Sequence, residues 1–468
     1  MKKLWSVCLI AAMLAGCLTG CGGLGGKNAG DAPAETTTAE DAAGAGTKAE
    51  APDGSAAGEV VEIQFFHTTW VEGMLDILEE AIAGFENEHP NIKIVETRTS
   101  WTDAPSQLMT SIAGGTAPDL IMCNPSMLAQ FRGIGALADM TDLVPQEMLD
   151  SMLPSAVQMV TTEEGKIDGL PQEGCNWALF YRKDLFEEAG LDPEKPPKTW
   201  DEFLECAKAL TKDTDGDGKI DQYGYGWPVQ AENATDYWVN FMQMCGADIS
   251  GYADGQWQSK LSDEAAKQGT QIMVDLVQEY GVSPKSVVDS DWEAICNMFV
   301  EGEVAMMHNG AWVTGSVAEK GPELDGKWGT AVLFDGPERA AYRGHPNTFN
   351  IMEASKHKQE AWEFLEYFYN TASTRDEGLT IAGSFCNASG GMLYTEDFVD
   401  YARDHYNEYL QPFLDEVYDC YIPPLDPQWE TLASMYGRST VQQMIMGDVS
   451  VDDGLKTLDH QLKLLHGE

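Results

Sequence analysis

The segment VEIQFFHTTWVEGMLDILEEAIAGFENEHPNIKIVETRTSWTDAPSQLMTSIAGGTAPDLIMC, residues 61–123, alternates between the two apolar periodicities that distinguish strands from helices. Apolar residues alternate along 61–67, as in a half-buried strand, and then recur at spacings of about three and four along 75–85, as on one face of a helix. The same pair of patterns repeats over 92–112, and the wholly apolar residues 120–123 are typical of a strand buried on both faces. This order predicts a parallel sheet with helices on both faces, and therefore an α/β fold.

The size and charge of the chain limit its architecture and its partners. About 410 residues follow the N-terminal region, more than one hydrophobic core normally organises, so we expect two lobes. The formal net charge of −47 argues against nucleic acid as a partner, because phosphate binding depends on Lys and Arg. The same charge disfavours adhesion to anionic lipid surfaces.

The first 58 residues have the composition of an export signal followed by a tether. Lys2 and Lys3 precede an apolar run over residues 4–14, which is followed by small residues, as in a secretory signal peptide covering residues 1–21. Residues 22–58 are almost wholly Gly, Ala, Thr, Pro and acidic residues. Such a segment buries too little apolar surface to fold, so we expect a disordered tether with a reach of roughly 35 Å.

The cysteines do not form a recognisable framework. Of the 10 cysteines, three lie in the signal, which leaves an odd number scattered through apolar segments. We therefore expect buried free thiols rather than disulfides. The sequence contains neither a CxxC pair nor an HExxH motif, so we expect no zinc site.

An acidic loop has the spacing of a calcium-binding loop. Asp213, Asp215, Asp217 and Asp221 occupy positions one, three, five and nine of an EF-hand pattern, with the required glycine at position six. Position twelve is Gly224 rather than the bidentate Glu, which excludes an isolated EF-hand. A structural calcium ion and a turn stabilised by its own Asp side chains remain the two interpretations.

Six short stretches occur in a characteristic order along most of residues 60–370. They are FENEHPNIKI (85–94), GTAPDL (115–120), YRKDLF (181–186), PKTWDEF (197–203), GEVAMM (302–307) followed by GAW (310–312), and EAWEFL (360–365). In this order they resemble the extracellular solute-binding proteins of bacterial ABC importers, in particular the carbohydrate-binding group related to maltose-binding protein. The N-terminal signal agrees with this resemblance independently.

Two tetrapeptides of the signal, Leu14-Ala-Gly-Cys17 and Leu18-Thr-Gly-Cys21, resemble the lipobox of bacterial lipoproteins, whose cysteine is lipidated. Cys21 is favoured because it gives the longer apolar run and leads directly into the tether, and Cys17 is the alternative. The resemblance implies a protein anchored by lipid to the outer face of the cytoplasmic membrane.

The resemblance also implies the fold, which is the two-lobed type II fold of periplasmic binding proteins with a ligand cleft between the lobes. The first lobe would hold residues 59–173 and 341–384, and the second lobe residues 174–340 and 385–468. Sites at domain interfaces, beyond the carboxyl ends of strands, agree with this arrangement.

A sugar presents hydroxyl groups at its edge and apolar C–H faces above and below, so its site needs polar edges and flat aromatic rings. Residues near predicted strand ends, and Trp312 in the Gly-x-Trp pattern, meet this need best. The candidate ligand-binding residues are His67, Trp70, Trp101, Asn124, Ser126, Glu173, Asn176, Trp227, Trp238, Asn309, Trp312, Asn347 and Phe385. Each has an alternative in core packing, loop hydrogen bonding or helix capping. We expect Trp177 in the sheet core and Trp429 to pack at the start of the terminal helical region.

These observations predict a non-catalytic receptor that captures a mono- or oligosaccharide by hinge closure and delivers it to the permease subunits of an ABC importer. We expect a monomer without a cofactor, apart from the calcium ion considered above. A secreted glycoside hydrolase or lyase is an alternative, because 76 acidic residues leave room for a catalytic carboxylate pair. A receptor for a cationic or peptidic solute is a third hypothesis, which the acidic balance permits.

Overall fold

The computed structural model describes residues 60–69, 71–230, 234–340, 344–419 and 424–468. The signal, the tether, both candidate lipidation sites and Trp70 lie outside the described residues. No helix in the described ranges is both long enough and apolar enough to cross a membrane.

The predicted alternation of strands and helices at the start of the chain is confirmed. The elements are β1 (Val61–His67), α1 (Glu72–Glu88), β2 (Ile92–Arg98), α2 (Ala104–Ala113) and β3 (Leu120–Cys123). β1 pairs in parallel with both β2 and β3, and every residue of β3 is buried. The wholly apolar composition of β3 therefore reflects a strand covered on both faces.

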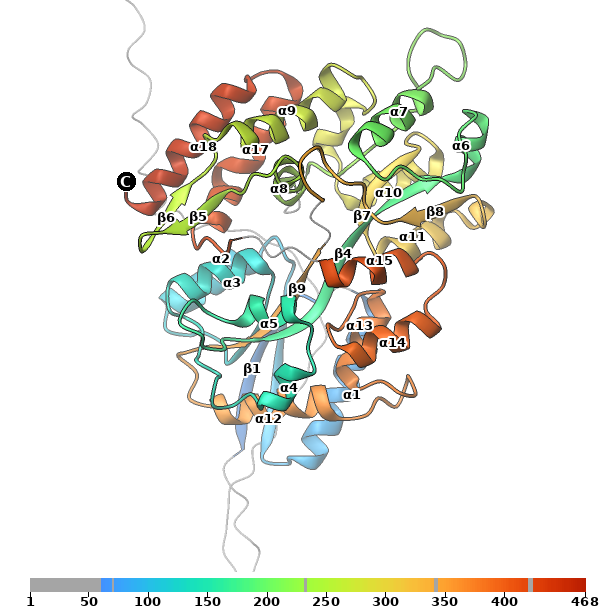
Figure 1. Cartoon of the computed structure of the whole chain (residues 1–468). Coiled ribbons are helices and arrows are strands. Elements are labelled where there is room, and N and C mark those ends of the chain that lie inside the picture. The colour runs from blue at the N-terminus through green and yellow to red at the C-terminus, as the bar shows by residue number, and fades with distance from the viewer. Residues whose placement is uncertain (1–59, 70, 231–233, 341–343, 420–423) are drawn as a thin grey trace, which may run out of the picture. The chain divides into compact units, whose positions relative to one another are not determined.

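The rest of the sheet is antiparallel, which the sequence did not predict. β9 (Gly344–Ile351) lies antiparallel between β3 and β4 (Leu170–Arg182). β4 continues antiparallel to β7 (Met306–Gly310) and to β8 (Trp328–Ala331). The order is β2-β1-β3-β9-β4-β7, with β8 on β4, so the long strand β4 joins two groups of elements (Figure 1).

A small antiparallel hairpin, β5 (Ser250–Ala253) and β6 (Gln256–Ser259), forms a second sheet. Four helices matter for the site described below. They are α3 (Pro125–Gly133), α8 (Ala234–Met244), α10 (Trp292–Glu301) and α16 (Trp429–Leu432). The chain continues from α16 through a π-helical turn over Ala433–Gly437 into α17 (Arg438–Met446), and ends with α18 (Val451–His466).

The remaining helices pack partly on the sheet and partly on other helices. They are α4 (Gln146–Asp150), α5 (Pro154–Val160), α6 (Lys183–Glu188), α7 (Trp200–Leu210), α9 (Glu264–Gln278), α11 (Val313–Lys320), α12 (Lys358–Asn370), α13 (Ile381–Ser389), α14 (Glu396–His405) and α15 (Gln411–Glu416), with short 3-10 turns at Lys285–Asp289, Pro322–Leu324 and Val417–Asp419. The five cysteines that the structure describes with side chains are free thiols, as predicted, and four of them are buried.

Side-chain caps fix the starts of the helices that bear the site. The Asn124 side chain accepts a hydrogen bond from the Met127 amide at the start of α3 (2.9 Å). The Asp291 side chain accepts one from the Ala294 amide at the start of α10 (2.8 Å). Each cap satisfies a backbone N–H group that the helix leaves unpaired, so the residues beside it have a defined position.

Candidate functional site

A cavity of about 600 Å³ opens beyond the ends of β1, β2 and β3, within the size range of small-molecule sites. Its walls come from the segments that follow these strands, from β4 and β9, from α8 and α10, and from residues 424–429. These segments are far apart in the sequence, so the cavity depends on the whole sheet being assembled.

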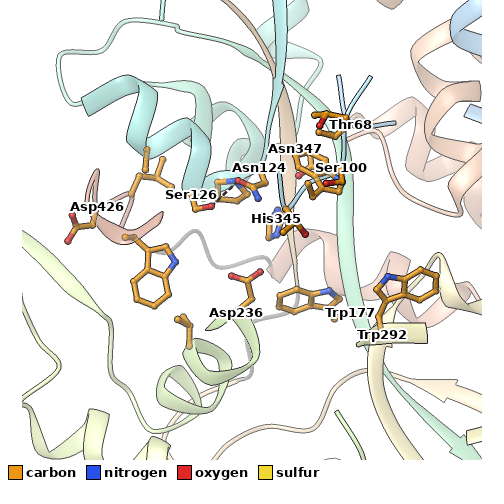
Figure 2. A pocket seen from close by; sticks show the side chains of 18 of the residues that line it. Thr68, Ser100, Asn124, Ser126, Trp177, Asp236, Trp292, His345, Asn347 and Asp426 are labelled. Atoms are coloured by element: carbon orange, nitrogen blue, oxygen red, sulfur yellow. Dashed lines mark hydrogen bonds between the residues drawn. The ribbon is translucent and has the colours of Figure 1, made fainter. Parts of the chain in front are cut away.

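One wall is polar and consists of residues at strand ends. Thr68 follows β1, Ser100 follows β2 and Asn124 follows β3. Because β1 is parallel to its two neighbours, the carboxyl ends of the three strands meet at one edge of the sheet. His345 and Asn347 of the antiparallel strand β9 join them there, and Figure 2 shows these side chains grouped together.

Hydrogen bonds within this wall hold its side chains in place. Asn124 Oδ1 accepts from the Met127 amide and lies 2.9 Å from Ser126 Oγ, which leaves the Asn124 amide nitrogen to donate to a ligand. Ser126 Oγ also lies 2.5 Å from Glu430 Oε2, so its single proton is shared between two acceptors. Ser126 therefore connects α3 with α16, which packs against α3 beside the cavity.

The facing wall is aromatic. Trp177 of β4 is almost fully buried and stacks on Tyr237, with ring centroids 5.4 Å apart. Trp292 is the first residue of α10, and its carbonyl oxygen accepts a hydrogen bond from Asn309 Nδ2 (3.3 Å). Trp101, Trp312 and Trp429 also line the cavity. The lining thus contains five indole rings, and although Trp177 is almost fully covered, the more open rings offer flat apolar faces to the C–H faces of a ligand.

The charged groups of the lining are few. Asp236 lies in the first turn of α8 and, in Figure 2, its carboxylate faces the polar wall. Arg98 ends β2, and Asp426 is paired with His466 outside the cavity (3.0 Å). Burial lowers the pKa of His345 to about 4, so this imidazole is neutral at physiological pH. A neutral imidazole offers one donor and one acceptor, which suits hydroxyl groups.

Five of the sequence-predicted ligand-binding residues line this cavity. They are Trp101, Asn124, Ser126, Trp312 and Asn347. For Asn124 and Ser126 the sequence left ligand binding and helix capping as alternatives. Both residues line the cavity and also take part in the cap of α3. Trp70 is outside the described residues, so its placement stays a prediction.

Two predicted residues lie one layer behind the cavity. The His67 side chain is buried, with Nδ1 3.1 Å from the hydroxyl of Thr69, and Thr69 rather than His67 reaches the lining. Asn309 is likewise buried and donates to the Trp292 carbonyl. Both residues support lining residues through hydrogen bonds.

The other predicted residues are buried in packing or in polar networks and do not line the cavity. They are Glu173, Asn176, Trp227, Trp238 and Phe385. The indole N–H of Trp238 donates to Thr270 Oγ1 (2.8 Å), and the Asn176 amide donates to the Phe413 carbonyl (3.1 Å). Ser389 donates to Glu173, and Trp227 and Phe385 pack in the main hydrophobic core. Aromatic composition near a predicted turn did not distinguish core from cavity at these positions.

Sequence reasoning missed most of the aromatic wall. Trp177 and Trp429 were expected to pack in the core, yet both also contribute to the cavity lining. Asp236 and Trp292 were not singled out, although each lies in the first turn of a helix that follows a loop. The sequence analysis looked for aromatic and polar residues at strand ends. The same search at helix starts would have found these two residues.

The acidic loop lies apart from this cavity and brings together three of its four carboxylates. Oxygen atoms of Asp213, Asp215 and Asp221 lie within 4.8 Å of one another, a group that can hold a cation. Asp217 is outside this group and forms an ion pair with Lys219 (2.9 Å). Hydrogen bonds from the Gly218 and Gly216 amides lower the pKa of Asp213. Calcium binding stays a prediction.

The chain resembles known proteins along most of its length. Residues 72–375 match the family of bacterial extracellular solute-binding proteins. A Brucella abortus protein named only as a binding protein is 28% identical over 388 residues, which cover 81% of this chain and 87% of that protein. A lactose-binding protein of Rhizobium radiobacter is 26% identical over 307 residues, 63% of this chain and 67% of the relative.

Solved structures show the same fold. An ABC transporter solute-binding protein of Thermotoga lettingae, bound with α-D-tagatose, has a TM-score of 0.71 at 22% identity and covers 87% of this chain and 100% of its own. The Listeria monocytogenes substrate-binding protein in complex with cycloalternan has a TM-score of 0.72 at 21% identity, with coverages of 87% and 100%. The predicted two-lobed type II fold is thereby confirmed. With a family match that spans well over half of its residues, this chain belongs to the bacterial extracellular solute-binding proteins.

Proposed function

We propose that this chain is the binding component of a bacterial carbohydrate importer, and that it captures a mono- or oligosaccharide and passes it unaltered to a membrane permease. The observation that carries the proposal is the composition of the cavity, whose lining combines five tryptophan rings with hydroxyl, amide and imidazole groups. Flat rings fit the apolar faces of a sugar, and neutral polar groups fit its hydroxyls.

The names of related proteins support a saccharide ligand. They include the lactose-binding protein of Rhizobium radiobacter and an arabinooligosaccharide-binding protein of Halalkalibacterium halodurans, which is 24% identical over 317 residues. The Thermotoga lettingae structure holds α-D-tagatose, and the Listeria monocytogenes structure holds cycloalternan. These ligands differ in length, so the relatives support the class of ligand rather than one sugar.

Hinge closure would use the contacts that already cross the cavity. The lining draws on both predicted lobes, residues 59–173 with 341–384 and residues 174–340 with 385–468, whose boundaries stay predictions. Ser126 contacts Glu430, and the Gln130 amide donates to Thr431 Oγ1 (3.4 Å), so α3 and α16 meet beside the site. A ligand that touches both walls favours this closed arrangement, because only differential affinity shifts the balance between two conformations.

The two alternative functions have less support. A glycoside hydrolase needs two carboxyl groups on either side of the bond that it cleaves. The described lining contains only Asp236 and Asp426, and the Asp426 carboxylate is bound by His466. For a cationic solute the same lining offers these two carboxylates, but it also contains the like charge of Arg98, and its other polar groups are neutral.

We also propose that the mature protein begins at a lipidated Cys21, with Cys17 as the alternative, and that residues 22–58 tether it to the outer face of the cytoplasmic membrane. The extracellular character of the family agrees with export. Metabolic labelling with a fatty acid, compared between Cys21→Ala and Cys17→Ala, tests this assignment. Loss of the label in one variant identifies the lipidated residue, and labelling in both contradicts the proposal.

Calorimetry tests the function directly. A panel of lactose, maltotriose and arabinooligosaccharides is titrated into the purified protein, and we expect at least one saccharide to bind with a micromolar Kd, about −8 kcal/mol. Mass spectrometry of co-purified small molecules extends the panel. Binding of another solute class without any saccharide would contradict the proposal, and turnover of a bound oligosaccharide would favour the hydrolase.

A further inference from the structure

We infer that a second saccharide-binding site lies outside the main cavity, between the β5–β6 hairpin and the C-terminal end of α18. This inference goes beyond the proposed function, which needs one site only. A cavity of about 270 Å³ is formed there by residues of β6, of the loop before α16 and of the end of α18. Figure 1 shows the hairpin beside α18, which packs against β6.

The hairpin places one aromatic ring at this cavity. Trp257 lines the cavity and is half-buried. Across the hairpin it pairs with Tyr252, which lies outside the lining and packs edge to face on it, with ring centroids 5.4 Å apart and an angle of 61°. Tyr252 therefore holds the Trp257 ring in place, and the indole is the platform for an apolar ligand face.

Polar groups surround this platform. Gln256 and Gln428 each offer an amide donor and an amide acceptor, and Glu468 offers a carboxylate. Donors and acceptors around an aromatic ring match the hydroxyl edge and the C–H face of one sugar ring. The smaller volume, compared with about 600 Å³ for the main cavity, fits one sugar unit or the end of a longer oligosaccharide.

His466 is the buried polar group of this second cavity. Its side chain is 6% exposed, and its Nε2 lies 3.0 Å from both carboxylate oxygens of Asp426. The other ring nitrogen, Nδ1, is buried and makes no hydrogen bond to the described residues. A buried nitrogen without a hydrogen bond costs free energy, and a ligand hydroxyl would satisfy it if the atoms that cover this nitrogen moved aside on binding.

The contact between His466 and Asp426 connects the two cavities. Asp426 lines the main cavity while its carboxylate points away from Asn124 and Asp236, as Figure 2 shows, and His466 lines the second cavity. The Asp426 carbonyl also accepts a hydrogen bond from the Trp429 amide (3.0 Å). A sugar bound to His466 would therefore act on the segment that positions Trp429, one of the rings of the main site.

Ligand-observed saturation-transfer NMR on the full chain tests the second site, because this method detects weak, rapidly exchanging ligands. The sugars cannot be kept out of the main cavity at high concentration, so the two sites are separated by their affinities. Maltotriose, lactose and an arabinooligosaccharide are each titrated from about 1 μM to about 10 mM, a range that spans a micromolar Kd for the main cavity and a millimolar Kd for the second site. We expect the signal of at least one of them to show a second, millimolar phase.

A substitution on the hairpin localises that phase. Trp257→Ala should reduce the millimolar phase at least fivefold, while Gln258→Ala, an exposed residue of the same strand outside the cavity, should leave it unchanged. A millimolar phase unaffected by Trp257→Ala, or no such phase with any of the sugars, overturns the second site. A micromolar phase that Trp292→Ala weakens and Trp257→Ala does not change supports the proposed function independently of the second site. A Trp257-dependent phase without any tight binding supports the second site and contradicts the proposed function.

Discussion

The two walls of the main cavity come from different kinds of positions in the sequence. Most of the polar wall consists of residues that follow three neighbouring strands, among them Thr68, Ser100 and Asn124, and the rest comes from β9. The aromatic wall takes Trp177 from the middle of β4 and Trp292 from the start of α10. The residues after β1, β2 and β3 follow from a local order of strands and helices, whereas β9 and the aromatic wall depend on how distant elements pack. Only the first group is therefore readable from local sequence.

The walls also differ in what their side chains can contribute to binding. Polar groups such as Asn124 and Ser126 are already hydrogen-bonded to the protein, so they are fixed and select the orientation of a ligand. The indole rings have broad faces and supply contact area. We therefore expect the aromatic wall to provide most of the affinity and the polar wall most of the specificity.

The largest effect is expected at Glu173, on the strand that joins the two walls. Burial raises the pKa of Glu173 from its ordinary 4.5 to about 7, although the hydrogen bond from Ser389 acts in the opposite direction. The protonated carboxyl therefore stabilises the fold, fully below pH 4.5, and this stabilisation is lost as the pH rises through about 7. Glu173→Gln should therefore leave the free energy of unfolding almost unchanged at about pH 5 and increase it by up to about 3 kcal/mol at about pH 9.

Urea denaturation at both pH values measures this difference in the free energy of unfolding. Glu62→Gln is the matched control, because Glu62 is an exposed carboxylate at the start of the same sheet. A pH-independent effect of Glu173→Gln would mean that the buried carboxyl is not the titrating group.

Replacement of an indole ring should weaken binding next most strongly. Trp292→Ala removes a partly exposed face of the aromatic wall, and we expect an increase in Kd of about thirtyfold, or about 2 kcal/mol. Trp292→Phe keeps an apolar ring and should recover at least half of that loss. Calorimetry with the best saccharide of the panel gives both values, and an unchanged Kd in the alanine variant would assign the affinity to the polar wall instead.

The sequence predicted the parts of this protein that depend on neighbouring residues. Alternation and helical spacing gave β1, α1, β2, α2 and β3 in order, and the position after a strand gave Asn124 and Ser126. The resemblance to solute-binding proteins supplied the two-lobed fold. Both kinds of inference use patterns that occupy a few consecutive residues.

The parts that were missed depend on long-range pairing. β9 inserts antiparallel between β3 and β4, more than two hundred residues after β3, and no local pattern specifies that pairing. For the same reason Trp227 and Trp238 were indistinguishable from Trp177 and Trp292 by composition. The first two are covered on all sides by helices and strands, and the latter two face the cavity.

Two substitutions of Asn124 separate its role as the cap of α3 from its role as a hydrogen-bond donor to the ligand. Asn124→Ala removes both the cap of α3 and the amide donor, so we expect a loss of about 1 kcal/mol of stability and a Kd several times higher. Asn124→Asp keeps a capping oxygen and should retain the stability while still losing the donor. Thermal melts and calorimetry on both variants test this, and equal stability of wild type and Asn124→Ala would contradict the capping role.

The smallest effect is expected at the acidic loop, which is remote from both walls and so tests whether stability and binding are separable. If calcium occupies Asp213, Asp215 and Asp221, millimolar calcium should raise the melting temperature by a few degrees at most, corresponding to about 1 kcal/mol, and a chelator should reverse the change. Asp221→Asn should abolish the response, whereas Asp217→Asn should preserve it, because Asp217 is paired with Lys219.

Since the carboxylates are mutually repulsive without a cation, an identical melt with and without chelator would show that the hydrogen bonds of the turn are sufficient. The saccharide Kd should be the same with calcium, with chelator and in both Asp variants, because the loop contributes no residue to the cavity lining.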